Sequence, residues 1–259
     1  MTKQLLMYDK VVPLNAQAHK DLYIKPAKEY GYAKELNSVP LTAVEFASAS
    51  TEYAIVFAGT DDEVMPAVIM GVDKNENLYC AGEESAWNAN YVPAFIRRYP
   101  FVFSNSSDGK KLILCIDESY SGCNVEGRGE RLFDTDGEKS MYLRNVLGFL
   151  EDYQLHFRHT QAFCKKLVEL DLLQPMTATV NVPDAAQKVI SGFSGIDRAK
   201  LKALPEKTLW ELAQNDWLEL IYLHLQSIRS FGQSIDRVLK ENAKTPIETA
   251  SPEASAEVH

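Results

Sequence analysis

Short apolar runs separated by turn residues fill the first half of the chain. The runs are rich in apolar and β-branched residues, and the segments between them are rich in Gly, Asp, Asn and Ser, which tolerate turn dihedral angles. This pattern predicts four strands, at residues 53–58, 65–72, 100–104 and 111–117. Their simplest arrangement is an antiparallel meander, interrupted by a short helix at 91–98 with Pro93 in its first turn.

The spacing of apolar residues becomes helical after Gly137. From Ser140 to about Leu172 they recur every three or four residues, as on one face of a long amphipathic helix, which Pro175 is expected to end. The later elements are a hairpin of residues 177–182 and 188–193 around Pro183-Asp184, and helices at 206–213 and 217–239.

These elements divide the chain at about residue 138. Residues 1–138 are strand-rich, and residues 139–240 form a helical part that contains the hairpin at 177–193. Residues 241–259 contain prolines, Ala, Ser and Glu but no aromatic residue, which predicts a disordered acidic tail. The fold class is therefore α+β, with a strand-rich N-terminal antiparallel sheet part followed by a helix-rich C-terminal part.

Composition narrows the class of protein. The chain has 259 residues, of which 46% are hydrophobic, so one large domain or two small ones can form a core. Its net charge of -9 repels phosphate backbones and anionic lipids, so we expect no nucleic-acid partner. The apolar runs are strand-sized, which argues against a membrane span, and Asp9 interrupts any signal-peptide core. We expect a cytoplasmic protein, with surface association only through a non-classical export route.

No motif identifies a catalytic reaction. The four cysteines are irregularly spaced without a CxxC, which indicates reduced thiols. GxSxG, GxxxxGK[ST] and GxGxxG patterns in the required context are absent, so we predict no catalytic residue and no cofactor. His19 and Asp21 form an HxD like that of two-histidine, one-carboxylate iron sites, but a second histidine would have to come from a predicted helix or the tail. This metal site is the weaker alternative to a surface or capping role.

Aromatic and arginine residues are densest at residues 91–101. Arginine binds carboxylates in a bidentate way and stacks on aromatic faces. Two interpretations remain open: the arginines pair internally with acidic residues near the end of the 111–117 strand, among them Glu130, or they hold an anionic ligand or partner. The candidate structural or binding cluster consists of Trp87, Tyr91, Arg97, Arg98, Tyr99, Asp117, Glu118 and Arg131.

Residues 87–101, here called the signature block, resemble the W-x-x-x-YVPAxIRRYPF block of the bacterial SapC family. Further segments resemble other blocks of the family in order, and the similarity runs from about Val12 to Phe231, with Ala54 where the family has proline. The family is described as S-layer-related, and its genes tend to lie near TonB-dependent receptors and flavin-dependent halogenase-like genes. A permease subunit shares the name but must span a membrane, which does not fit this chain.

The resemblance implies a non-enzymatic accessory or binding protein related to S-layer or cell-surface pathways, and it assigns no catalytic residue. The alternative is a metal-dependent enzyme, similar to a non-haem iron oxygenase, or a halogenase-associated partner. The binding partner would be an unknown protein or a small anionic ligand. A homo-oligomer is a further hypothesis, which predicts an exposed apolar face on the 217–239 helix.

Overall fold

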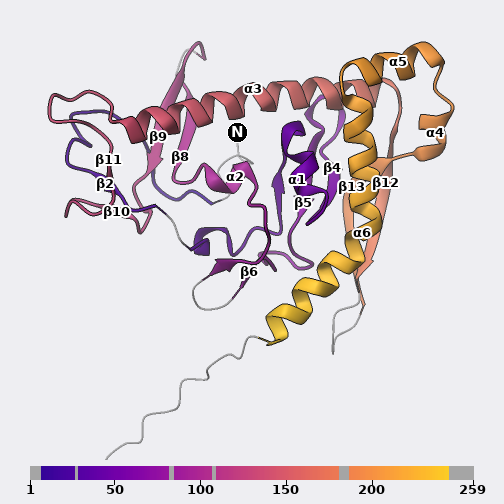
Figure 1. Ribbon diagram of the computed structural model, residues 1–259, viewed down its shortest axis with the longest axis horizontal. Helices are drawn as coiled ribbons and strands as arrows, with labels where there is room; N and C mark the ends of the chain where they lie inside the picture. Colours follow the sequence, from indigo (N-terminus) through magenta and orange to yellow (C-terminus); the bar gives the residue numbers. More distant parts are fainter. Residues whose placement is uncertain (1–6, 27–28, 82–84, 107–108, 181–186, 245–259) are drawn as a thin grey trace, which may run out of the picture.

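The computed structural model describes residues 7–26, 29–81, 85–106, 109–180 and 187–244 (Figure 1). The helices are α1 (Phe46–Ala49), α2 (Ala94–Arg97), α3 (Met141–Glu169), α4 (Arg198–Lys202), α5 (Glu206–Gln214) and α6 (Trp217–Lys244), with 3-10 turns at Gly31–Ala33, Ala43–Glu45 and Asp61–Glu63. The strands are β1 (Val11–Pro13), β2 (Tyr23–Ile24), β3 (Ser38–Pro40), β4 (Ala54–Ala58), β5 (Met65–Ile69), β6 (Cys80–Ala81), β7 (Ala86–Trp87), β8 (Phe101–Asn105), β9 (Leu112–Asp117), β10 (Cys123–Asn124), β11 (Glu130–Arg131), β12 (Leu173–Val180) and β13 (Lys188–Ile196).

The strands form antiparallel sheets, which together with the helices confirm the α+β class. The five-stranded sheet has the order β12-β13-β4-β5-β3, so it combines strands from both sides of residue 138. The hairpin of β8 and β9 belongs to another sheet, ordered β1-β9-β8, and β2 pairs with β10 and β11 in a third. The single meander expected from the sequence is therefore wrong, because the segment that contains α2 carries the chain from one sheet to another.

Helix α3 joins two hydrophobic clusters. Its 29 residues span roughly 43 Å at the rise of an α-helix, and it runs along one whole edge of the molecule (Figure 1). Leu143 and Leu150 in its first half pack into the cluster around β8, β9 and β2, which we call the β9 core. Phe163 and Leu167 in its second half pack into the cluster around the five-stranded sheet, which we call the β4 core. One helix thus fixes the distance between the two cores.

The ends of α3 follow local chemistry. Ser140 caps the N-terminus, since its Oγ accepts from the N–H of Leu143 at 3.2 Å. The helix ends at Glu169, and the chain turns through Asp171, whose φ is 51°. Pro175 is not the terminator that the sequence suggested. It lies in β12 opposite Ser194, and β12 is an edge strand, where a residue without an N–H is tolerated.

The C-terminal elements follow the predicted order, except that the short helix α4 was not predicted. The hairpin is longer than expected, and Pro183-Asp184 lies outside the described residues. Helix α6 continues to Lys244, so the predicted tail is wrong for residues 241–244, while residues 245–259 lie outside the described part of the chain. Across the described residues, no helix combines the length and the hydropathy that crossing a bilayer requires.

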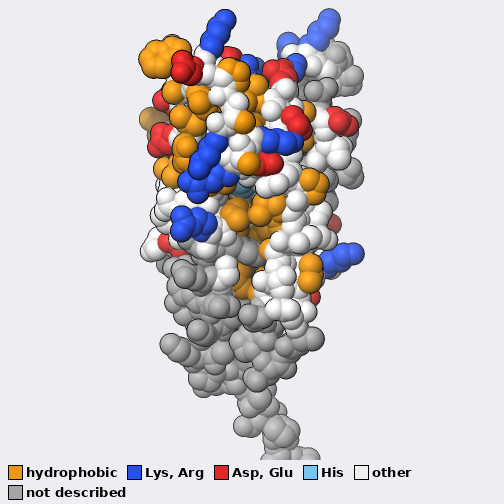
Figure 2. Space-filling view, turned by 90° about the vertical axis from the view of Figure 1, so that its right-hand side faces the viewer, with side chains coloured by type: hydrophobic (Ala, Val, Ile, Leu, Met, Phe, Trp, Pro, Cys, Tyr) orange, Lys and Arg blue, Asp and Glu red, His pale blue; other side chains and the backbone are white. Residues whose placement is uncertain are grey.

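Apolar side chains lie between charged ones over the end of the molecule formed by α4, α5 and α6 (Figure 2). Among them, Trp210 of α5 is 66% exposed and Tyr222 of α6 is 49% exposed. Part of the 217–239 helix therefore does present apolar surface. Whether this face binds a second copy of the chain stays a prediction.

Candidate functional site

The signature block connects the β4 core to the β9 core. Phe95 and Ile96 of α2 are buried in the β4 core, and Phe101 at the start of β8 is buried in the β9 core. Tyr99 packs against both. Pro93 is the N-cap of α2 and not a residue of its first turn, so the helix is shorter than predicted. The block therefore lies where the two cores meet.

Trp87 and Tyr91 are held by a hydrogen-bonded group centred on Tyr53. The indole Nε1 of Trp87 donates to the hydroxyl of Tyr53 at 2.9 Å and to the carbonyl of Tyr91 at 3.1 Å. The hydroxyl of Tyr53 in turn donates to the carbonyl of Tyr91. Burial raises the pKa of Tyr53 far above its ordinary value, so this hydroxyl stays a neutral donor. These contacts fix the strand β7 to the start of the YVPA segment.

Glu45 provides a buried carboxylate that the sequence did not single out as a site residue. Its Oε2 accepts from the N–H and the hydroxyl of Thr42, at 2.8 and 2.7 Å. Its Oε1 accepts from the hydroxyl of Tyr91 at 2.8 Å and from the N–H of Ala94 at 2.7 Å. Glu45 is 4% exposed, and four donors offset the cost of burying its charge. This carboxylate joins the turn before α1 to the first residue of α2.

The two adjacent arginines of the block have different environments. Arg98 is 5% exposed, and its guanidinium lies 4.2 Å from the ring centroid of Phe95 and 5.2 Å from that of Tyr153 on α3. Arg97 is exposed, its Nε donates to the carbonyl of Val92 at 2.9 Å, and its guanidinium lies 5.3 Å from the ring centroid of Phe149. Arg98 therefore belongs to the interior, and Arg97 to the surface.

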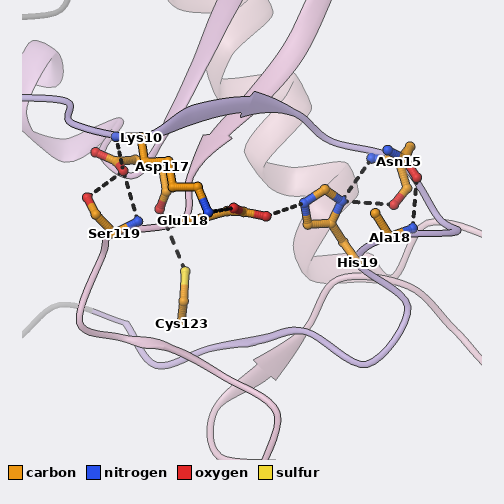
Figure 3. A network of polar contacts seen from close by, with 8 residues as sticks. All are labelled: Lys10, Asn15, Ala18, His19, Asp117, Glu118, Ser119 and Cys123. Carbon is orange, nitrogen blue, oxygen red and sulfur yellow. Dashed lines mark hydrogen bonds and ion pairs between the residues drawn. The ribbon is translucent and has the colours of Figure 1, made fainter.

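Asp117 ends β9 and is fully buried. Its carboxylate accepts from the N–H of Lys10 at 3.0 Å and from the N–H and hydroxyl of Ser119 at 3.0 and 2.6 Å (Figure 3). It also accepts from the N–H of Asp9 at 2.8 Å and from the hydroxyl of Tyr99 at 3.4 Å. Burial acts to raise its pKa, but these hydrogen bonds outweigh burial and lower the pKa below its ordinary value. Asp117 therefore anchors the N-terminal segment to β9.

Glu118 points away from Asp117 and pairs with different side chains (Figure 3). Its carboxylate lies 2.7 Å from Nζ of Lys10 and 3.4 Å from Nε2 of His19. The hydrogen bond from Lys10 is the main cause that lowers the pKa of Glu118. Within the described residues, neither Asp117 nor Glu118 pairs with Arg97 or Arg98, so that part of the expected ion-pair network is wrong: main-chain, hydroxyl, lysine and histidine groups occupy the two carboxylates.

His19 does not assemble a metal site with any other histidine of the described residues. Its Nδ1 lies 3.0 Å from the carbonyl of Asn15, and its Nε2 faces Glu118. Asp21 is exposed. His224 is buried in the β4 core with both ring nitrogens hydrogen-bonded. In the part of the chain that the structure describes, no three His, Cys, Asp or Glu side chains are grouped so that they could hold a metal ion.

Arg131 lies on β11, apart from the two arginines of the signature block. Its guanidinium is 5.9 Å from the ring centroid of Tyr23, which pairs with it across the sheet. Its buried Nε has no hydrogen-bond partner among the described residues. The eight residues of the candidate cluster therefore lie in several different environments, and they do not converge on one point.

A small pocket lies beside Arg97. It has a volume of about 200 Å³ and is lined by Ile24, Pro26, Tyr30, Tyr32, Arg97, Tyr99, Pro100, Tyr120 and Tyr142. We call it the tyrosine pocket. Of the candidate cluster it contains Arg97 and Tyr99. The other tyrosines were not predicted, and the one signal in the sequence is the count of 12 tyrosines, which does not show that they meet.

A larger groove of about 620 Å³ follows α3 past the hairpin of β8 and β9. Leu112, Leu114 and Leu147 contribute apolar surface, while Glu151 and Arg158 bring charges of opposite sign. No residue of the signature block lines it. Arg97, Tyr99 and Pro100 of the signature block line the tyrosine pocket, and Arg97 is the one cation among its described lining residues, so we take this pocket as the candidate binding site.

Comparisons with known proteins agree with the resemblance carried by the block. Searches of curated proteins and of solved structures gave no match. The family model described as SapC matches residues 14–233, which is most of the chain. The chain therefore belongs to the SapC family.

Proposed function

We propose that this SapC-family chain is a non-enzymatic accessory protein that binds a small anion in the tyrosine pocket, in a pathway connected with the cell surface. The observation that carries the proposal is the position of Arg97. It is exposed, it lines the pocket, and it is the one charged residue among the described residues of the lining. A guanidinium in the lining of a pocket attracts an anion and repels a cation.

The setting of Arg97 supports binding over a purely structural role. Its guanidinium lies 5.8 Å from the ring centroid of Tyr91 and 5.3 Å from that of Phe149, and its Nε is tied to the carbonyl of Val92. These contacts restrict the side chain before any ligand arrives, so less conformational entropy is lost on binding. A guanidinium has five N–H donors, more than these contacts use.

Localisation and the link to surface pathways rest on the family and are part of the proposal. The tight hydrogen bonding of Asp117, Glu118 and His19 to protein groups fits an architectural role for them. Their side chains are engaged with neighbouring main-chain and side-chain groups. The binding function is therefore assigned to Arg97 and the tyrosines alone.

The test is a titration with simple anions. Acetate, inorganic phosphate and benzoate are added separately to protein labelled with ¹⁵N-arginine, and the Nε–H signal of Arg97 is followed by NMR. A saturable shift with at least one of the three anions is expected, and it should be absent for Arg97→Ala. No saturable shift with any of the three would overturn the proposal.

Two matched variants separate binding from folding. Arg198→Ala removes an exposed arginine from α4, and it should leave both the titration and the melting temperature unchanged. Arg98→Ala removes the buried guanidinium and should lower the melting temperature by several degrees. If Arg97→Ala destabilises the protein as strongly as Arg98→Ala, Arg97 is part of the framework and the proposal fails.

A further inference from the structure

The walls of the tyrosine pocket are aromatic faces and edges held in fixed orientations. The rings of Tyr32 and Tyr99 are stacked, with centroids 4.2 Å apart and planes inclined by 23°. Tyr120 meets Tyr99 edge to face, with centroids 5.3 Å apart and planes at 86°. Such a surface offers both the negative face and the positive edge of a ring to an incoming flat ligand. The lining rings therefore favour a planar, ring-bearing molecule.

Three hydroxyl groups of the pocket are already engaged. Tyr120 donates to the carbonyl of Lys25 at 2.8 Å, Tyr99 contacts Asp117, and Tyr32 lies 3.4 Å from the carbonyl of Ile96. These contacts hold the rings in place. Because these hydroxyls are already hydrogen-bonded, they offer little further hydrogen bonding to a ligand that is rich in hydroxyl groups.

The hydroxyls of Tyr30 and Tyr142 are different, since neither has a hydrogen-bond partner among the described residues. Burial raises the pKa of Tyr142 to about 12, so its phenol is neutral and can donate a hydrogen bond at neutral pH. The guanidinium of Arg97 and the neutral phenol of Tyr142 both belong to the lining, so one ligand can use both donors. Both kinds of donor suit carboxylate oxygens.

Size and charge restrict the ligand further. The volume of about 200 Å³ is smaller than the roughly 300–1,000 Å³ of pockets that hold drug-sized ligands, which excludes a nucleotide. Among the described residues that line the pocket, Arg97 is the one charged side chain, which fits a monoanion. A bare inorganic anion would satisfy Arg97 but would leave the rings in contact with water.

We infer that the tyrosine pocket binds a compact aromatic carboxylate, whose ring packs against the tyrosine rings and whose carboxylate pairs with Arg97. The inference rests on the proposed binding function and adds the chemical class of the ligand. It requires both parts of the ligand, because the ring alone lacks the charge and a small carboxylate alone lacks the apolar surface.

The experiment compares four probes that separate these parts. Benzoate has ring and charge, benzamide has the ring without the charge, acetate has the charge without the ring, and inorganic phosphate is a different anion. We expect benzoate to bind at least about tenfold more tightly than the other three, which corresponds to about 1.4 kcal/mol. Arg97→Ala should weaken benzoate by about tenfold or more and leave benzamide unchanged. Tyr142→Phe, which removes only a hydroxyl, should weaken benzoate by a few-fold.

The outcomes distinguish the two proposals. If acetate or phosphate binds as tightly as benzoate, and does so only with Arg97 present, the anion site stands and the aromatic class is wrong. Equal binding of benzamide and benzoate would also overturn the inference, because charge would then be irrelevant. If none of the anions binds, the proposed function itself fails. Unchanged far-ultraviolet circular dichroism and melting temperature establish that each variant is folded.

Discussion

His224 is expected to make the stability of this protein depend on pH. The imidazole projects from α6 between β4 and β13, at a place where these strands share a single registered pair, Ser194 with Phe57. The N–H of Ile196 on β13 donates to its Nε2 at 3.0 Å, and its Nδ1 donates to the carbonyl of Ile55 on β4 at 2.8 Å. The ring thus replaces hydrogen bonds that would otherwise join the two strands.

These two contacts require the neutral ring. A protonated imidazole would point an N–H at the N–H of Ile196, and it would place a charge at a site that is 0% exposed. Burial is the main cause that lowers the pKa of His224 from 6.5 to about 4, although the hydrogen bond to Ile55 acts in the opposite direction. In the unfolded chain the ring regains its ordinary pKa.

The sign of the effect follows from proton linkage. Between the two pKa values the unfolded state binds more protons than the folded state, so stability falls as the pH is lowered from about 6.5 towards 4. At about pH 5 the loss that His224 causes is on the order of 2 kcal/mol relative to pH 7.5. Above about pH 7 its contribution to the pH dependence vanishes.

The assay is urea unfolding of the wild type and His224→Gln at about pH 7.5 and about pH 5. Glutamine retains a side-chain donor and acceptor but cannot titrate, so the variant should be less stable at pH 7.5 by about 1–3 kcal/mol, yet lose less stability on acidification than the wild type. His159→Gln, on an exposed position of α3, controls for the removal of one histidine. Equal losses in the wild type and His224→Gln would refute a neutral, buried imidazole.

Three other substitutions test further contacts. Thr160→Val removes the Oγ1 that accepts from the N–H of Ala43 at 2.8 Å, so the unfolding free energy in urea should fall by about 1 kcal/mol; an unchanged midpoint would contradict this. Glu45→Gln places an NH₂ group opposite N–H donors and should lower the unfolding free energy by about 2 kcal/mol in the same assay. A variant as stable as the wild type would contradict a stabilising role of the carboxylate. Burial acts to raise the pKa of Asp117, but hydrogen bonds, first that from Ser119, lower it, so its stabilisation should be present above about pH 4 and lost below. Asp117→Asn should therefore flatten the fall in melting temperature below that pH, and an equally steep fall would be inconsistent with this.

The periodic spacing of apolar residues predicted those elements whose buried residues recur along one continuous segment. The face of α3 was found because its buried residues recur along one continuous segment, from Leu143 to Leu167. Thr160 is fully buried, but the sequence did not predict its burial. Threonine carries a hydroxyl and is not counted as apolar, and the hydrogen-bond partner Ala43 is distant in the sequence. Pro175 was misplaced because the sequence does not show that β12 is an edge strand.

The candidate site was predictable only in part, for a related reason. Composition and the family resemblance pointed to Arg97 and Tyr99, which are two residues apart. Tyr30 and Tyr142 come from segments more than a hundred positions apart, and only the packing of α3 on the β9 core brings them together. Periodicity reports which side of an element is buried, and it carries no information about which distant element covers that side.

The opposite environments of Arg97 and Arg98 explain how one short block can serve both architecture and recognition. Successive residues of a helical turn point about 100° apart, so burying Arg98 against Phe95 and Tyr153 directs Arg97 outwards, to the rim of the pocket. Tyr99 completes this link, since it packs against both cores and also lines the pocket. The contacts that join the two cores therefore also set the geometry of the pocket. A substitution that weakens those contacts should weaken ligand binding even where the substituted residue does not touch the ligand.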